Sequence, residues 1–315
     1  MKYLEALVTA RDNDVDFSKI LESVSRLNRL LKTYYPHEVE NWSKTLENSI
    51  PKLLKEWQIT EYNVIKSSHF GIIFLAKSVK YGKCVFKIIP PCIDRYTSER
   101  SCYQSLNASF MCELYDYDDK CCAILLERCK DADLQFDGSK EELLNFFKRV
   151  MDSCEITVSK DLFSQFKNYK EILNDKLNQD NFEYKKDEIM GYVKQAAELF
   201  NSTFSDDDFT LIHGDMHRYN IMKRNDELVA IDPIGYVAPK EVDIVRYIAT
   251  ELCDNGGDIA QNGQELLDFF SAVSDRDILE KILFIDIVFR LHNSLFENED
   301  YKLTDRWLSI LKVIV

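Results

Sequence analysis

Two different hydrophobic patterns divide this 315-residue chain, and the change between them near residue 130 constrains its fold more than any other feature. Residues of roughly 58–129 contain short apolar runs separated by turn residues, namely NVIKSSHFGIIFLAKS, YGKCVFKIIPP and CAILLER. From about residue 140 onward, apolar residues recur with helical spacing, as in EELLNFFKRVMDSC and KDEIMGYVKQAAELFN. The sequence therefore predicts an α+β fold, in which a small antiparallel sheet is followed by a mainly helical part.

Helical periodicity also precedes the β-rich part of the chain. In FSKILESVSRLNRLLKTYY the leucines, isoleucine and valine share one helical face, so we expect residues 1–45 to form a helical extension. The segment DRYTSERSCYQSL lies between the last two β runs, after Pro90-Pro91, and predicts one helix inserted in the sheet. Two further helices are expected after residue 240.

The net charge of −14, from 40 basic and 54 acidic residues, excludes some classes of partner. Nucleic-acid binding needs clustered Lys and Arg, so we expect no nucleic-acid partner. The acidity favours a cationic small substrate, although acidity also simply keeps many proteins soluble.

The nine cysteines and the N-terminal segment bear on the cellular compartment. The cysteines show no C-x-x-C spacing, so neither a zinc ribbon nor a thioredoxin-like centre is predicted. The segment MKYLEALVTARDNDVDF lacks the apolar stretch of a secretion signal, so we expect reduced thiols and a cytoplasmic protein. The most apolar run, residues 278–291, carries four charged residues and is too short to cross a membrane. We expect it to form a buried C-terminal helix.

The segment LIHGDMHRYNIM, residues 211–222, places an aspartate and an asparagine five residues apart after an apolar strand. Phosphoryl transfer from a nucleotide needs a carboxylate beside the acceptor hydroxyl and oxygen ligands for a metal ion. The spacing of Asp215 and Asn220 is that of the protein-kinase catalytic loop, and Asp232 follows in the segment AIDP. An alternative is a zinc site at His213 and His217, but the intervening glycine and the missing glutamate argue against the helix it requires.

The set LIHGDMHRYNIM and LVAIDPIGYVAPKEVDIVRY resembles the aminoglycoside phosphotransferase and choline-kinase-like superfamily, which has an H-G-D-x-x-x-x-N loop. The AIDP-x-G motif is most similar to that of the streptomycin 6-kinase branch, which includes hydroxyurea phosphotransferases. The resemblance implies a bilobal protein-kinase-like fold. Its parts would be a nucleotide-binding lobe at residues 46–129, a hinge at about 126–130, and a helical lobe at 130–315 that carries the catalytic loop and the acceptor site.

The same resemblance implies roles for residues around the motif. Asp215 would be the catalytic base, and Asn220 and Asp232 would hold Mg²⁺ against the phosphates of ATP, with GTP as an alternative nucleotide. His213 and Asp243 would support the loop structurally. His217 faces either the solvent or the acceptor.

In the β-rich part, the resemblance implies three contacts with the nucleotide: a lysine, the hinge and one loop. Lys87 would clamp the α- and β-phosphates and pair with Glu99, whereas Lys83 is the alternative clamp and a surface position is the alternative for Glu99. The hinge LLERC would bind adenine through backbone groups. The loop SSHFGIIF departs from the family because it has one glycine where several are common. The assigned hinge and loop residues are Glu127, Cys129, Ser67, Ser68 and Gly71.

The acceptor is left open by the sequence. We expect a small molecule with a hydroxyl group, in the first place a streptomycin-like aminoglycoside. The alternatives are a metabolic kinase for a sugar, amino alcohol or fructosamine, or a protein-directed kinase. Arg290 and His292, in FRLHNSLF, are candidate substrate contacts, and an internal ion pair between Arg290 and Asp286 is the alternative.

Overall fold

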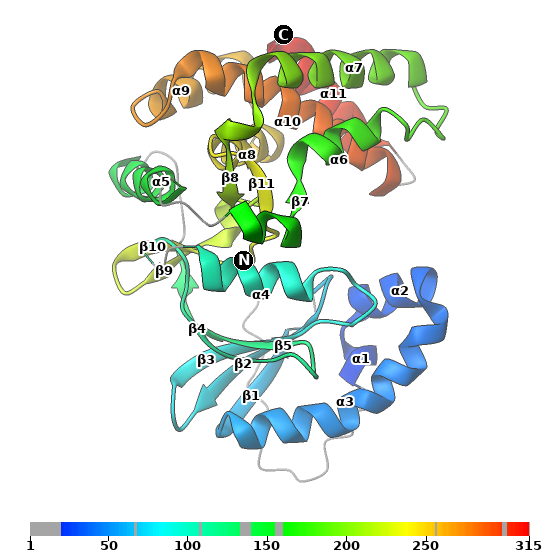
Figure 1. The fold of residues 1–315 in the computed structure, drawn as a ribbon, viewed down its shortest axis with the longest axis vertical. Coiled ribbons are helices and arrows are strands. Elements are labelled where there is room, and N and C mark those ends of the chain that lie inside the picture. Colours follow the sequence, from blue (N-terminus) through cyan, green and yellow to red (C-terminus); the bar gives the residue numbers. More distant parts are fainter. Residues whose placement is uncertain are drawn as a thin grey trace. The chain divides into compact units, whose positions relative to one another are not determined.

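The computed structural model describes residues 20–65, 68–106, 109–132, 140–154, 160–255, 257–297 and 301–314. The chain forms two compact units, whose helices and strands are labelled in Figure 1. The first unit comprises Met1–Arg100 and Cys112–Cys129, and the second comprises Ser101–Met111 and Lys130–Val315.

The first unit contains a five-stranded antiparallel sheet with the strand order β1-β2-β3-β5-β4. Alternate residues of β2 are buried, namely Ile72, Phe74 and Ala76, as in a sheet with one face in the core. Helix α4, Tyr96–Ser105, follows β3 in the chain, so the prediction of a small antiparallel sheet with one inserted helix is confirmed. The strands are β1 Ile59–Ile65, β2 Ile72–Ser78, β3 Gly82–Ile88, β4 Leu114–Asp118 and β5 Ala123–Glu127.

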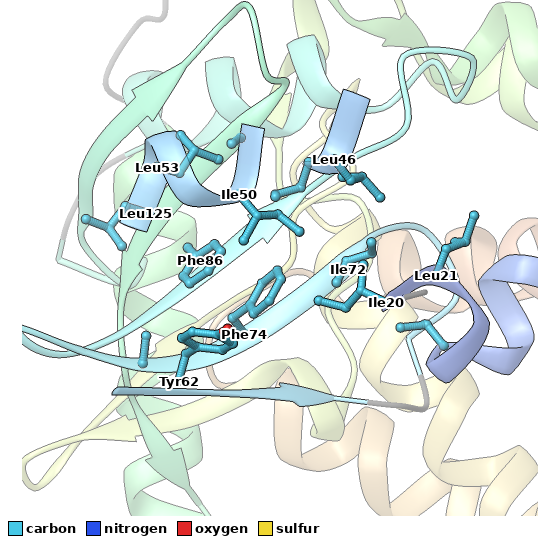
Figure 2. Close-up of a cluster of buried hydrophobic side chains, with 14 of the residues drawn as sticks. Ile20, Leu21, Leu46, Ile50, Leu53, Tyr62, Ile72, Phe74, Phe86 and Leu125 are labelled. Atoms are coloured by element: carbon cyan, nitrogen blue, oxygen red, sulfur yellow. The ribbon is translucent and has the colours of Figure 1, made fainter. Parts of the chain in front are cut away.

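Three helices precede this sheet and belong to the same unit: α1 Ile20–Ser23, α2 Ser25–Tyr34 and α3 Pro36–Glu56. Pro36 is the first residue of α3, where its missing N–H removes no helical hydrogen bond. Apolar residues of the three helices share one core with the sheet, and Figure 2 shows Ile50 of α3 packed towards Phe74 and Phe86. These two phenylalanine rings stack with their centroids 4.0 Å apart. The helices are thus part of the core of the first unit.

The second unit is mainly helical. The expected C-terminal helix at residues 278–291 is confirmed as part of α10, and its residues Leu279, Ile282 and Leu283 are fully buried. None of the helices in the described residues is both long and apolar enough to span a membrane. The α-helices are α5 Lys140–Cys154, α6 Tyr169–Lys176, α7 Lys186–Thr203, α8 Val242–Asp254, α9 Ile259–Phe270, α10 Arg276–Glu297 and α11 Lys302–Ile314, and the short 3-10 helices are η2 Lys160–Gln165, η3 Asp206–Asp208 and η4 Arg218–Asn220.

The expectation of two helices after residue 240 is wrong, because four helices, α8 to α11, occupy the described residues there. The breaks between them are short. Gly257 has a φ of 102°, and the side chain of Asp258 caps α9 by accepting the N–H of Gln261. Tyr301, with a φ of 50°, precedes α11. Apolar residues continue with helical spacing on both sides of such turns, so the periodicity alone does not separate the helices.

Two three-stranded sheets of the second unit, β10-β9-β6 and β7-β11-β8, surround the predicted catalytic segment. Strand β8 ends at Ile212, immediately before His213, and β9 begins at Ile221, immediately after Asn220. Regular strands therefore fix both ends of the loop 213–220. The strands are β6 Lys130–Asp131, β7 Lys167–Asn168, β8 Phe209–Ile212, β9 Ile221–Arg224, β10 Glu227–Ala230 and β11 Tyr236–Pro239.

Candidate active site

The loop 213–220 turns sharply at Gly214, in a conformation and at a close approach that favour glycine. Gly214 has a φ of +81°, a left-handed conformation that other residues rarely adopt. A Cβ atom at this position would also lie 2.9 Å from the Tyr236 ring, in the neighbouring strand β11. The His-Gly-Asp sequence thus matches a turn in which the backbone approaches β11 too closely for any side chain.

The carboxylate of Asp243, in the first turn of α8, accepts two hydrogen bonds from this turn. The backbone N–H of His213 donates to Oδ2 at 2.9 Å, and that of Gly214 donates to Oδ1 at 2.8 Å. Asp243 is fully buried. Burial raises its pKa to about 7, and the two N–H donors and Arg246 limit the rise. The carboxylate therefore binds the turn with both of its oxygens.

His213 uses both ring nitrogens inside the loop. Nε2 lies 2.9 Å from the carbonyl oxygen of Ile231, and the backbone N–H of Asp215 donates to Nδ1 at 3.2 Å. A nitrogen that accepts from an N–H carries no proton, so Nε2 is the protonated nitrogen. Burial lowers the pKa of His213 to about 4, which keeps the ring neutral. Because both nitrogens have partners, this imidazole is not a zinc ligand in the structure.

The side chain of Asp215 lies among an amide, an imidazole and a guanidinium group. Asn220 Nδ2 donates to the backbone oxygen of Asp215 at 2.9 Å and lies 3.4 Å from its Oδ2. His217 Nε2 is 3.5 Å from Oδ2, and Arg246 Nη1 is 3.9 Å from Oδ1. Burial acts to raise the pKa of Asp215, but His217, Arg246 and Arg290 together bring it below its usual value. Asp215 is therefore a carboxylate at neutral pH, and His217 lies on the Asp215 side of the loop.

Asn220 and Asp232, the predicted metal ligands, lie in connected segments. The N–H of Ile231, next to Asp232, donates to the backbone oxygen of Asn220 at 2.9 Å. Asp232 has a φ of 59°, and its own N–H donates to the hydroxyl oxygen of Tyr103 at 2.9 Å. A left-handed aspartate is strained, and such strain is concentrated at functional sites.

The donor set of these two residues fits Mg²⁺. Asn220 donates through its amide nitrogen, which leaves its carbonyl oxygen as the atom for a cation. Mg²⁺ is bound through one or two protein oxygens together with phosphates and water, so an asparagine and an aspartate are sufficient. Among the described residues, no group of three or more His, Cys, Asp or Glu side chains forms a metal cluster.

Behind Asp215, two arginines share one buried aspartate that the motif did not indicate. Arg246 Nη2 lies 2.9 Å from Asp286 Oδ1, and Arg290 Nε donates to Asp286 Oδ2 at 3.0 Å. The alternative expected for Arg290, an internal ion pair, is thus present. Arg246 was missed, although it follows Asp243 by three residues on the same helix, a spacing that places both on one face.

His292 has no exposed surface and therefore cannot touch a substrate. Its Nε2 lies 3.0 Å from the carbonyl oxygen of Gln179, and its ring packs edge-on against Phe182. The expectation of a substrate contact at His292 is corrected by this burial: the residue lies in the core on the inner face of α10, where its polar atom binds a backbone group.

In the first unit, Lys87 and Glu99 form a buried ion pair. Lys87 Nζ donates to both carboxylate oxygens of Glu99, at 2.9 and 2.7 Å, and Arg95 Nε donates to Glu99 Oε2 at 3.2 Å. Glu99 is fully buried, so it does not lie on the helix surface. Lys83, the alternative clamp, is exposed on β3 opposite Lys77.

The remaining assigned residues lie in the loop before β2 and at the end of β5. Gly71 is buried beside Lys87, and Ser68 is half-buried. Ser67 lies outside the described residues. Glu127 ends β5 and pairs with Cys84 of β3, and the chain enters the second unit directly after Cys129.

Comparisons with known proteins find structural relatives only. No family model matches the chain, and no curated protein matches its sequence. Choline kinase from Cryptosporidium parvum Iowa II gives a TM-score of 0.62 at 13% identity, over 85% of this chain and 95% of that chain. Choline kinase LicA from Streptococcus pneumoniae gives 0.61 at 10% identity, over 86% and 99%. A thermostable mutant of aminoglycoside phosphotransferase APH(4)-Ia, in a ternary complex with ADP and hygromycin B, gives 0.59 at 11% identity, over 84% and 97%.

These likenesses extend over most of each compared chain, and they agree with the antiparallel sheet of the first unit and the helical second unit. At 10–13% identity a structural likeness shows the fold and not the substrate. The chain therefore has the protein-kinase-like fold of the aminoglycoside phosphotransferases and choline kinases.

Proposed function

We propose that this protein is an ATP-dependent phosphotransferase that moves the γ-phosphate to a hydroxyl group of a small molecule. The observation that carries the proposal is the loop 213–220, which holds the Asp215 carboxylate ionised beside the side chain of Asn220. The fold supports it, because the similar structures are named as kinases and phosphotransferases and one of them is a complex with ADP. We further propose a cytoplasmic enzyme, with GTP as the alternative nucleotide.

In this proposal Asp215 orients the acceptor and takes its proton. The acceptor oxygen forms a bond to the γ-phosphorus, the bond from that phosphorus to the β-phosphate oxygen breaks, and the hydroxyl proton passes to Asp215. The nearby cations keep Asp215 ionised and therefore a weak base. A weak base suffices because the transition state of phosphoryl transfer is loose, so that the proton moves late and positioning contributes most.

Asn220 and Asp232 would hold Mg²⁺ through side-chain oxygens. When bound, Mg²⁺ neutralises charge on the nucleotide phosphates. The hydrogen bond from Ile231 to Asn220 and the one from Asp232 to Tyr103 keep the two ligand segments in place. Lys87, oriented by Glu99, would bind the α- and β-phosphates, and the backbone of Glu127 and Cys129 would bind the adenine ring.

Two classes of acceptor remain, and the charges near Asp215 bear on the choice. A polycationic aminoglycoside needs carboxylates that can receive its ammonium groups. In the described part of the second unit, Asp286 is bound by Arg246 and Arg290, and Glu251 is bound by Arg218 and Asn255. This pairing favours the second candidate, a metabolic hydroxy compound, and within it an uncharged sugar, because the ammonium group of an amino alcohol needs a carboxylate as an aminoglycoside does.

A substrate screen with the purified protein tests the proposal. ATP consumption is measured with aminoglycosides, choline, homoserine, fructosamines and sugars, together with a protein-labelling control. The variant Asp215→Ala should lose transfer by at least about a hundredfold and keep nucleotide affinity, since Asp215 acts on the acceptor. Asp226→Ala, an exposed aspartate in the β9–β10 turn, is the matched control. Near-normal turnover by Asp215→Ala would contradict the assigned base, and labelled proteins without small-molecule turnover would indicate a protein kinase.

A further inference from the structure

The described loop residues between β1 and β2 contact three cationic side chains: one from α2, one from β3 and one from the turn before α4. Gly71 lies directly on Lys87 of β3: a Cβ atom at Gly71 would be 2.9 Å from the Ile88 carbonyl oxygen and 3.3 Å from Lys87 Cε. Only a glycine allows the loop backbone to come this close to the lysine side chain. The loop therefore passes immediately over the predicted phosphate clamp.

The residue before it, Phe70, contacts a second cation. The guanidinium carbon of Arg95 lies over the Phe70 ring at 4.9 Å from its centroid, which is the geometry of a cation–π contact. Arg95 also donates to Glu99, the carboxylate that binds Lys87. Arg95 and Lys87 thus share one anion, and both border the loop.

His69 contacts the third cation, which comes from the N-terminal helices. Arg26 Nη1 of α2 lies 3.1 Å from His69 Nε2. An arginine can only donate, so Nε2 is the acceptor and the neutral ring carries its proton on Nδ1. Partial burial and the charge of Arg26 both lower the pKa of His69, in agreement with a neutral ring. The loop therefore presents an N–H at His69 Nδ1 beside the guanidinium of Arg26.

Helix α2 is fixed in its place by the core of the first unit. Leu27, the neighbour of Arg26, is fully buried in the cluster that also contains Ile20, Leu21 and Ile72. Figure 2 shows Ile20 and Leu21 next to Ile72, the residue that directly follows Gly71. The contact between Arg26 and the loop is therefore anchored at both ends by buried side chains.

We infer that Arg26 and Arg95 bind the nucleotide phosphates together with Lys87, so that helix α2 completes the nucleotide site; the inference rests on the phosphotransferase function proposed above. Glycine-rich loops bind phosphates through successive backbone N–H groups. This loop has one glycine among its described residues, Ser68–Gly71, and three cations around it. Guanidinium groups bind phosphate oxygens with paired N–H donors, so side chains here take the role of the missing glycine amides.

Nucleotides with different numbers of phosphates separate this role from a purely structural one. The dissociation constants of adenosine, AMP, ADP and ATP are measured by calorimetric titration for wild type and for Arg26→Ala. A lost charge-assisted contact weakens ATP binding by roughly tenfold to a hundredfold, and leaves adenosine binding within about twofold. Arg26→Lys keeps the positive charge but lacks the paired N–H donors of a guanidinium group. Its affinity for ATP should therefore lie between those of wild type and Arg26→Ala.

Lys32→Ala is the control, because Lys32 is an exposed cation about one and two-thirds turns further along the same helix. It should bind all four compounds like wild type. His69→Gln serves as a second variant that disturbs the loop without removing a charge.

The outcomes distinguish a failure of the proposed phosphotransferase function from a failure of the proposed role of Arg26. Wild-type protein that binds no nucleotide overturns the proposed function itself. Wild-type binding of ATP with unchanged binding by Arg26→Ala overturns the role of Arg26 alone. An equal loss for adenosine and ATP would show that Arg26 only holds the structure, as would a loss by His69→Gln that equals that of Arg26→Ala for every compound. A loss that grows from AMP to ATP in Arg26→Ala alone supports direct phosphate contact.

Discussion

Replacing Lys87 by methionine should lower the free energy of unfolding of the first unit. The reason is that the buried carboxylate of Glu99 loses one of its hydrogen-bond partners. Glu99 is fully buried and Lys87 is 5% exposed, and their two hydrogen bonds are 2.9 and 2.7 Å long. Breaking a buried ion pair by removing one partner costs about 3–5 kcal/mol. Arg95 still binds Glu99 at 3.2 Å in the variant, so we expect a loss at the lower end, about 3 kcal/mol.

Urea unfolding followed by tryptophan fluorescence measures this loss. Trp42 and Trp57 are buried in the first unit and report on its core. For a urea dependence of about 1–3 kcal/mol per M, a loss of about 3 kcal/mol lowers the midpoint by about 1–3 M. Glu99→Gln and the double variant complete a mutant cycle, in which the two changes should be coupled by more than about 1.5 kcal/mol.

The exposed Lys83 on the same strand provides the control for both stability and catalysis. Lys83→Met should change stability by less than about 0.5 kcal/mol, because Lys83 is exposed. Lys87→Met should also lower kcat by about 10²–10³, the effect of losing one donor to transition-state charge. A Lys87→Met protein with the wild-type urea midpoint would refute the reasoning about the buried pair. A Lys83→Met protein that loses as much free energy of unfolding as Lys87→Met would refute it too.

Two further predictions concern the second unit. Gly214→Ala should destabilise the protein by at least about 2 kcal/mol and abolish transfer, because Gly214 has a φ of +81° and a Cβ atom there would lie 2.9 Å from Tyr236. The control is Gly191→Ala, in the interior of α7 with open space around it. In urea unfolding this control should be stabilised by roughly 0.5–1 kcal/mol. Burial lowers the pKa of His292 to about 4, so below 6.5 the unfolded state gains a proton that the folded state does not, and stability is lost as the pH falls from 6.5 to 4. Between pH 7.5 and 5 wild type should therefore lose about 2 kcal/mol more than His292→Gln, and equal losses would contradict the depressed pKa.

The sequence predicted the antiparallel sheet with its inserted helix and a loop that follows a strand at residues 211–222, but not the number of helices after residue 240 or the residues that hold the loop. The short apolar run that forms β2 and the helical spacing of α10 are local features, so a strand and a helix were predicted there correctly. The contact between Arg26 and His69 joins residues 43 positions apart and follows no periodic pattern. In helix α8 every residue from Val242 to Leu252 is buried. The sequence therefore shows no polar face that would separate the charged residues in contact with the loop 213–220 from the rest of the helix.

Helix α8 fixes the loop 213–220 through three charged side chains, which contact successive loop residues in the order of the chain. Asp243 binds the amides of residues 213 and 214, Arg246 lies near Asp215, and Glu251 binds Arg218. Eight residues of helix rise about 12 Å, whereas the loop from 213 to 218 can extend to at most about 18 Å. The loop therefore runs along the helix in the same direction and is only partly extended. The turn that brings His217 close to Asp215 accounts for the difference from its full length. A shift of one residue would leave buried charges without partners at a cost of several kcal/mol, so the three contacts together permit one register of the loop.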